Sequence, residues 1–394
     1  MADIIDLLAD AGDVAQLRER RPEAKDNAQA SFAALLEPEA PGTISYAERY
    51  AIATFVAGVY QVPRAQSFYS DLLEEESEEL AAEVARAVER GITTGPYSGG
   101  GFTLFDGSPR LAAALDFAHL LSFHPKDASP AAIGHLQAAG WSNDDIVTLG
   151  QLVSFLSFQL RVAHGLAVLA GTAQPAAVTE APRPTQTPEW EPGEGTLAPD
   201  VVKPQRFVAH SLGWKPWVPP QPKEEFTDAQ RDALIKPERI DMEYFRLLAR
   251  DPAALKARTK TDLDIFYNTD GGLGRAEREL AATVVSRFNG CEYCASVHQQ
   301  RSKEEGGDAA VINRLLEEGV DADLGTEQWS AIRDAALALT SSPFAFDASH
   351  VEGLREAGFD TLAIIDVINS SAFFNWANRL MLTLGEPDVP KRFR

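Results

Sequence analysis

Apolar residues recur at helical spacing in the C-terminal half of this chain, and a clean alternation with a period of two is absent. Over 274–288 (GRAERELAATVVSRF) the spacing predicts an amphipathic helix, whose apolar positions are Leu280, Ala281, Val284, Val285 and Phe288. The segment 362–384 is apolar on nearly all sides, which predicts a helix buried within a bundle or at a subunit contact. Its Phe373, Phe374 and Trp376 suit core packing, or the wall of an apolar pocket. The pattern as a whole predicts an all-α fold.

Capping residues divide this half into helices. Four residues are suited to helix N-caps, namely Asp308, Thr326, Asp347 and Asp360, and three glycines are suited to helix ends, namely Gly319, Gly358 and Gly385. Asn289-Gly290 is expected to break the helix over 274–288. Asn289 is then predicted to cap the next helix, with both cysteines in its first one or two turns.

An internal repeat relates the two halves. The segment 48–56 (ERYAIATFV) aligns with 277–285 (ERELAATVV), 229 residues later. Further on, 136–141 (LQAAGW) aligns with 354–359 (LREAGF), and 144–165 aligns with 362–383, at a register of 218 that places Phe155 over Phe373 and Arg161 over Arg379. The difference between the two registers, 229 and 218, predicts about eleven extra residues in the first copy, which we assign to the glycine-rich stretch 91–107.

The segment between the copies differs from both. Eleven of the chain's 24 prolines lie within 175–222, which excludes long helices there. Its three tryptophans, Trp190, Trp214 and Trp217, are unusual for a free linker, so we expect a strap packed on the domain surfaces. The predicted organisation is a domain over 1–172, a Pro-rich strap over 173–225 and a second domain over 226–394.

The chain's only two cysteines lie three residues apart, Cys291-Glu-Tyr-Cys294, and His298 follows four residues after the second. On one helix these three side chains lie at roughly 0°, 300° and 340° around the axis, so they share a face. Two thiols at this spacing can close a disulfide, and the imidazole can hold or move a sulfur's proton. Glu279 precedes the cluster by twelve residues, and a break between the helices allows it to fold back over the sulfurs. A helix N-terminus near the thiols would also lower their pKa.

Two other interpretations of the cluster stay open, a zinc site and an inactive remnant. A Cys-x-x-Cys pair in a reducing compartment is redox-active or binds metal more often than it forms a structural disulfide. A closed zinc site, however, usually needs four well-spaced Cys or His ligands. The cluster is also compatible with an inactive remnant. Taken alone, Glu279 would be a solvated helix residue and His298 a structural one, and only their joint spacing favours function.

These residues resemble a known family. Glu279, Cys291-x-x-Cys294 and His298 match the motif of the alkylhydroperoxidase D and carboxymuconolactone decarboxylase superfamily, in particular its peroxidase-related branch with a tyrosine between the cysteines. The resemblance implies two all-α helical-bundle domains, oligomerisation, and cysteine-based reduction of organic hydroperoxides. It also implies that Cys294 attacks the peroxide, that Cys291 resolves the sulfenic acid, and that Glu279 and His298 relay the proton. Tyr293 stands where the best-known alkylhydroperoxidase pattern has a histidine, and is a possible auxiliary residue.

The first copy lacks every reactive group of this motif. At the register of 229, Tyr50 takes the place of Glu279, Val62 that of Cys291, Ala65 that of Cys294 and Tyr69 that of His298. We therefore predict a catalytically silent N-terminal domain that serves its partner structurally.

Composition restricts the partners. A formal net charge of −22 over 394 residues disfavours nucleic acid and anionic membrane surfaces. The N-terminus has early acids and lacks the basic region of a secretory signal, and the longest uncharged apolar stretch, 146–160, is judged too short to span a bilayer. These features predict a cytoplasmic protein.

The sequence therefore predicts a thiol-dependent peroxidase, with antioxidant action on organic hydroperoxides through a Cys291/Cys294 disulfide. The expected partners are a hydroperoxide substrate, an external dithiol reductant and further copies of the chain in a homo-oligomer, with no metal or cofactor. Two alternatives remain. One is a cofactor-free decarboxylase of the carboxymuconolactone type, and the other is a non-catalytic scaffold or binding protein.

Overall fold

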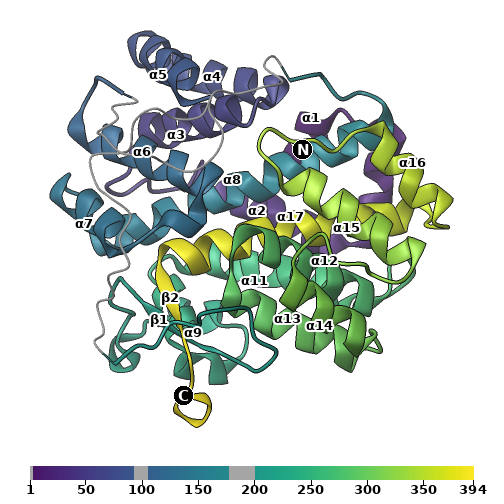
Figure 1. Ribbon diagram of the computed structural model, residues 1–394. Coiled ribbons are helices and arrows are strands. Elements are labelled where there is room, and N and C mark those ends of the chain that lie inside the picture. Colours follow the sequence, from purple (N-terminus) through teal and green to yellow (C-terminus); the bar gives the residue numbers. More distant parts are fainter. Residues whose placement is uncertain (1–2, 93–104, 177–199) are drawn as a thin grey trace.

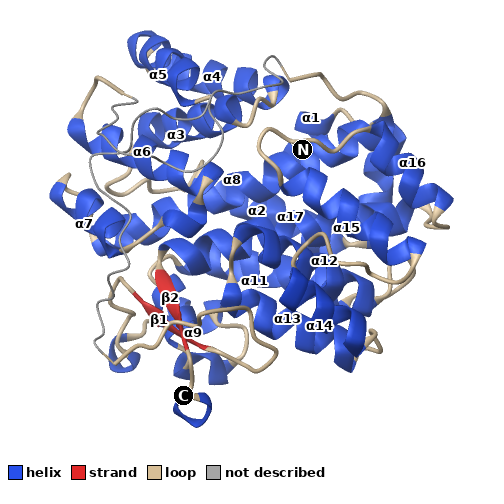
Figure 2. Ribbon diagram, in the orientation of Figure 1, coloured by secondary structure: helices blue, strands red, loops and turns tan. Residues whose placement is uncertain are grey.

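The computed structural model describes residues 3–92, 105–176 and 200–394, and nearly all of its ordered elements are helices (Figures 1 and 2). The first half contains α1 (Ile4–Ala9), α2 (Pro22–Leu35), α3 (Tyr46–Val59), α4 (Pro63–Glu76), α5 (Glu78–Gly91), α6 (Pro109–Phe123), α7 (Pro130–Ala138) and α8 (Asn143–Ala170). The second contains α9 (Asp228–Ala233), α10 (Glu243–Leu248), α11 (Pro252–Tyr267), α12 (Arg275–Asn289), α13 (Glu292–Glu304), α14 (Ala309–Glu318), α15 (Glu327–Thr340), α16 (Ala348–Glu356) and α17 (Thr361–Thr383). Short 3-10 helices cover Gly12–Arg20, Pro125–Asp127, Lys223–Glu225, Pro237–Asp241 and Lys391–Phe393. The predicted all-α class is confirmed.

The order of helices reproduces the repeat that the sequence predicts. The seven helices α2 to α8 recur as α11 to α17 in the same succession. α4 begins at Pro63 and α13 at Glu292, a register of 229, whereas α6 begins at Pro109 and α15 at Glu327, a register of 218. The extra residues of the first half therefore lie between the start of α4 and the start of α6. Most of the glycine-rich stretch 91–107 falls outside the described residues.

The two longest helices, α8 and α17, pack side by side through the centre of the molecule (Figure 1). Each carries an arginine that reaches into the other half. Arg161 Nη2 donates to the carbonyl of Thr340 at 3.0 Å, and Arg379 Nη2 donates to the carbonyl of Ser122, its counterpart, at 3.2 Å. The first half thus donates to the second through Arg161, and the second half donates to the equivalent carbonyl of the first through Arg379. This pairing is what an internal pseudo-dimer requires, because each copy buries the other's apolar face.

The helix α8 is also more apolar than the sequence analysis allowed. The stretch 146–160 is too short to span a bilayer, but the full helix, Asn143–Ala170, is long enough, and an 18-residue window of it has a mean hydropathy of 1.5, which is apolar enough by composition. Within the protein, 89% of that apolar window is buried. Its hydrophobicity is thus used for packing against α17 and neighbouring helices.

Residues 200–225 of the proline-rich strap pack on the second half. Its residues Gly213–Pro216 form β1, which pairs antiparallel with β2 (Gly385–Asp388) directly after α17, and this small sheet was not predicted (Figure 2). Trp214 and Trp217 are buried, as predicted, and Trp214 Nε1 donates to the carbonyl of Met381 at 2.9 Å. Trp190 and the glycine run 98–101 lie outside the described residues.

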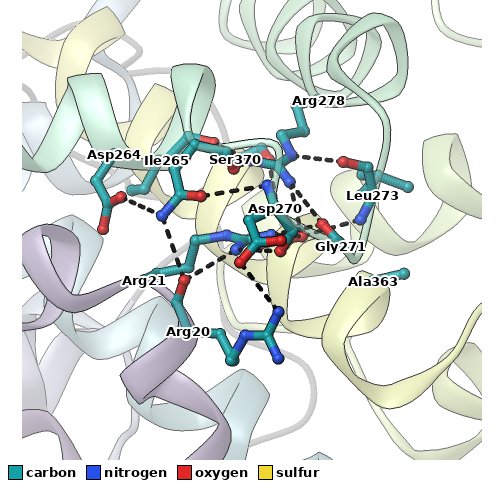
Figure 3. Close-up of polar contacts among 12 residues, drawn as sticks. Arg20, Arg21, Asp264, Ile265, Asp270, Gly271, Leu273, Arg278, Ala363 and Ser370 are labelled. Atoms are coloured by element: carbon teal, nitrogen blue, oxygen red, sulfur yellow. Dashed lines mark hydrogen bonds and ion pairs between the residues drawn. The ribbon is translucent and has the colours of Figure 1, made fainter.

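A buried ion-pair cluster ties the N-terminal segment to the second half (Figure 3). Asp366 on α17 accepts from Arg21 Nη2 at 2.8 Å and from Arg278 Nη2 at 3.0 Å, and all three side chains are at most 2% exposed. Arg21 also donates to the carbonyls of Asp270 and Gly271. Breaking such a buried network is costly because the remaining charges stay unpaired. The cluster fixes the start of α12, the helix that carries Glu279.

Candidate active site

The turn between α12 and α13 brings the sequence-predicted residues together. Gly290 adopts a left-handed conformation with φ of 78°, which ends α12 and redirects the chain within one residue. Cys291 is the N-cap of α13, and Cys294 lies in its first turn. Two expectations are corrected here. Asn289 is the last residue of α12 and caps nothing, because its side chain donates to Asn375 and Asn378, and Cys291 precedes the helix instead of lying within it.

Glu279 folds back onto His298 across this turn. Glu279 is fully buried, and its Oε2 lies 2.5 Å from Nδ1 of His298. A carboxylate can only accept, so Nδ1 carries the proton and the tautomer is fixed. Nε2, the other ring nitrogen, makes no hydrogen bond with a described residue. It is therefore available as a proton acceptor on the face of α13 that also carries Cys294.

A second partner holds the other oxygen of Glu279. Arg275, one turn earlier on α12, donates from Nη2 to Oε1 at 3.2 Å, and its guanidinium stacks on the Tyr267 ring at 3.8 Å. Burial raises the pKa of Glu279, but the charge of His298 and its hydrogen bond, helped by Arg301 and Arg275, outweigh burial and lower that pKa overall. Glu279 is therefore ionised at neutral pH and orients the imidazole.

The two thiols are reduced, buried and within hydrogen-bonding reach of each other. Cys291 is 2% exposed and Cys294 is 4% exposed. Burial raises the pKa of Cys291 well above its ordinary value, and a hydrogen bond and charge from the Cys294 sulfur raise it further. The backbone N–H of Cys294 opposes this increase. Cys291 therefore keeps its proton at neutral pH, even though it stands at the helix N-terminus.

The raised pKa of Cys291 predicts a pH dependence of stability. The folded protein holds this proton more tightly than the unfolded chain, whose thiol titrates near pH 9.0. The contribution of the Cys291 proton to the free energy of unfolding is therefore complete below pH 9.0 and is lost as the pH rises toward the folded-state pKa. We expect the free energy of unfolding of the reduced protein to fall above about pH 9, and that of Cys291→Ala to fall less. Urea unfolding of both proteins between pH 7 and 10.5 measures the difference, and parallel curves would contradict it.

Aromatic rings from α11 and α17 enclose the imidazole. Phe374 lies edge-on to His298 with ring centroids 4.2 Å apart, and Phe266 lies 6.0 Å from the same ring. Phe373 and Trp376, which suit core packing or a pocket wall by sequence, are fully buried and pack against each other and against Phe158 on α8. Tyr293 is partly buried. Its pKa is raised to about 12, mainly by burial and to a smaller extent by the charges of Cys294 and Cys291. It therefore stays protonated at neutral pH.

The N-terminal half repeats the backbone of the site without its chemistry. Val62 is the N-cap of α4, with φ and ψ of −103° and 87°, close to the −88° and 88° of Cys291. Ala65 and Tyr69 follow at the positions of Cys294 and His298, and both are fully buried. The Tyr69 hydroxyl donates to Gln159. The position of Glu279 is taken by Tyr50, whose pKa burial raises to about 12.

Several residues near the site were missed by sequence reasoning. Arg275 had a detectable signal, because it precedes Glu279 by four residues on one helix. Phe266, Tyr244 and Arg258 had none, because only folding packs α11 against α12 and α17, and α10 against α11. No group of three or more His, Cys, Asp or Glu side chains is placed to hold a metal ion within 3–92, 105–176 and 200–394.

Residues 252–340 match the model of the carboxymuconolactone decarboxylase family. The chain contains a domain of this family. The matched segment runs from the start of α11 to the end of α15 and includes Glu279, both cysteines and His298. The family domain is mostly helical, as the resemblance implied.

A solved structure is also similar to this chain. It is the crystal structure of an uncharacterized peroxidase-related protein from Silicibacter sp. TM1040, with 26% sequence identity and a TM-score of 0.36. The match covers 49% of this chain and 96% of that chain. Among curated proteins, none matches this chain.

Proposed function

We propose that this protein is a thiol-dependent peroxidase that reduces organic hydroperoxides through a Cys291/Cys294 disulfide. One observation carries the proposal. A pair of adjacent reduced thiols lies beside an imidazole whose Nδ1 is held 2.5 Å from a buried carboxylate. A positioned base next to a nucleophile, itself oriented by a third group, is the arrangement that activates a nucleophile.

Cys294 is the attacking thiol in this proposal. It precedes His298 by four residues on α13, so the two side chains are neighbours on one helical face, with Cβ atoms about 5–6 Å apart. His298 Nε2 accepts the thiol proton. The thiolate then attacks the terminal oxygen of R–O–OH, a sulfur–oxygen bond forms, the oxygen–oxygen bond breaks, and the leaving alkoxide takes the proton back from His298.

Cys291 resolves the sulfenic acid. Its sulfur attacks Cys294–OH, the sulfur–sulfur bond forms, and hydroxide leaves with the Cys291 proton as water. The raised pKa of Cys291 suits this second role, because a protonated thiol does not compete for the peroxide. An external dithiol then reduces the disulfide in two exchange steps and leaves as its own disulfide.

The same carboxylate and imidazole could serve cofactor-free decarboxylation, the reaction for which the family is named. That chemistry needs an acid–base pair and no thiol, so it leaves the two cysteines without a role. The two functions differ in their dependence on sulfur.

Steady-state assays test the proposal. Reduced protein with cumene hydroperoxide and excess dithiothreitol is expected to consume peroxide with one dithiol oxidised per peroxide. The Cys291→Ser/Cys294→Ser double variant is the control and is expected to show only the background rate. Equal consumption by both proteins, with correct folding of each by circular dichroism, would exclude thiol-based peroxidase activity.

A further inference from the structure

Arg258 on α11 is a largely buried cation that forms no ion pair with a described residue. Arg258 is 5% exposed. Its side chain forms no hydrogen bond or ion pair with any described residue, and its Nε is buried without an acceptor. Asp262, one turn later on the same helix, does not pair with it. A buried, uncompensated charge is costly in a folded protein, and this chain has a net charge of −22, so acids are abundant. The absence of a partner therefore needs a reason.

A second unpaired donor lies beside this arginine. The hydroxyl of Tyr244 on α10 is buried and has no hydrogen-bond partner. The Arg258 guanidinium lies 5.8 Å from the Tyr244 ring centroid, 5.0 Å from that of Phe373 and 5.9 Å from that of Trp376. One guanidinium and one phenol thus present unused donors within a wall of aromatic rings. Buried polar groups of this kind are normally satisfied, and one ligand with two acceptor oxygens could satisfy both donors.

This pair of donors adjoins the thiol site. The Phe373 ring that faces Arg258 also packs against Phe266 at 6.0 Å, and Phe266 is in turn 6.0 Å from the ring of His298. Burial raises the pKa of Tyr244, the charge of Arg258 opposes this increase, and the charges of Cys294 and Asp262 add to it, so the hydroxyl is within electrostatic reach of the sulfur. A ligand held by Arg258 and Tyr244 would therefore extend toward Cys294 along apolar rings.

We propose that Arg258 and Tyr244 form a carboxylate-binding site for the substrate, so that the preferred hydroperoxides carry a carboxylate at the end remote from the peroxide. A carboxylate presents two acceptor oxygens, which match the guanidinium fork, and leaves a lone pair for the phenol. A thiolate, the other anion of the site, offers one atom and cannot satisfy both donors. The surrounding rings favour an apolar or aromatic body on the ligand. The proposal rests on the thiol peroxidase function.

A binding experiment tests the site independently of catalysis. Reduced wild-type protein is titrated with phenylacetate, which has no peroxide bond, by isothermal calorimetry, and the titration is repeated with Arg258→Gln and Tyr244→Phe. We expect the affinity of Arg258→Gln to fall about tenfold or more and that of Tyr244→Phe to fall less, because a hydrogen bond to a charged group contributes more than a neutral one. Arg239→Gln is the matched control. That arginine also stacks on an aromatic ring, Phe245, but its Nη1 already donates to a carbonyl at 3.0 Å, so binding should be unchanged.

Outcomes of this titration separate the possible roles of Arg258. Phenylacetate binding of equal strength in wild type and Arg258→Gln, with both proteins folded by circular dichroism, would overturn the carboxylate site. A loss of thiolate absorbance at 240 nm in Arg258→Gln, with unchanged phenylacetate binding, would also overturn it and make Arg258 a partner of the thiolate. As a kinetic measure, the ratio of kcat/KM for para-carboxy cumene hydroperoxide to that for cumene hydroperoxide should fall in Arg258→Gln. An absence of turnover of both peroxides by wild type counts against the peroxidase function alone.

Discussion

The Cys294→Ser protein is expected to consume no hydroperoxide, whereas Cys291→Ser is expected to consume about one equivalent and stop. Cys294 is one helical turn from His298, which takes its proton and returns it to the leaving alkoxide. Cys291 stands nearer the helix N-terminus, but burial raises its pKa and keeps it protonated. Stopped-flow peroxide consumption with dimedone trapping of the sulfenic acid, located by peptide mass spectrometry, measures both variants.

Serine is a suitable replacement at both positions because it keeps the size and the hydrogen bonding of the thiol while removing the nucleophile. Both variants should retain the wild-type melting temperature in reduced form. Dimedone labelling of Cys291 in the Cys294→Ser protein, at the rate of the wild type, would reverse the assignment. The helix N-terminus would then outweigh the imidazole as the activator of the thiol.

The second large effect is expected at His298. His298→Ala should lower kcat/KM for cumene hydroperoxide by roughly 10²-fold, the scale of a positioned proton-transfer group. Tyr69→Phe is the matched control, because Tyr69 occupies the equivalent position of the first copy and its hydroxyl donates to Gln159. That variant should keep the wild-type rate. Equal losses in both variants would show that the N-terminal copy takes part in the reaction.

Glu279 is expected to act through His298. Glu279→Gln keeps the shape of the side chain but removes the charge that fixes the imidazole, so kcat should fall and its pH profile should shift. The ion pair with Arg275 is lost in this variant, but Arg275 keeps its second partner, Glu305 at 3.2 Å, so no charge is left unpaired and we expect only a modest cost in stability. An unfolded Glu279→Gln protein, with unchanged activity per folded molecule, would make Glu279 a structural residue.

The sequence was informative where local pattern decides structure. The helix over 274–288 differs from α12 by one residue at each end, and Asp308, Thr326, Asp347 and Asp360 all cap helices. The repeat also predicted the equivalence of α8 and α17, because duplicated helices keep their register, and their equivalent arginines, Arg161 and Arg379, make equivalent contacts. The pairing of Glu279 with His298 followed from the motif and from the break at Gly290.

Other features depend on contacts between distant segments. The strands β1 and β2 lie some 170 residues apart, and GWKP and GEPD have no strand-like alternation, so only the folded chain reveals the sheet. Asn289 was expected to cap α13, but Gly290 allows α12 to continue one residue further and gives Asn289 two partners on α17. Arg258 and Tyr244 look like ordinary helix residues in sequence. Their unpaired donors become visible only when α10, α11 and α17 are packed together.

The most direct test of the thiol chemistry is the intact mass of the reduced protein before and after one equivalent of cumene hydroperoxide. The proposed mechanism predicts a loss of two hydrogens, with both thiols disappearing together, and full recovery of the original mass after dithiothreitol. An unchanged mass and two remaining thiols, in a protein shown to be folded, would contradict a Cys291/Cys294 redox disulfide.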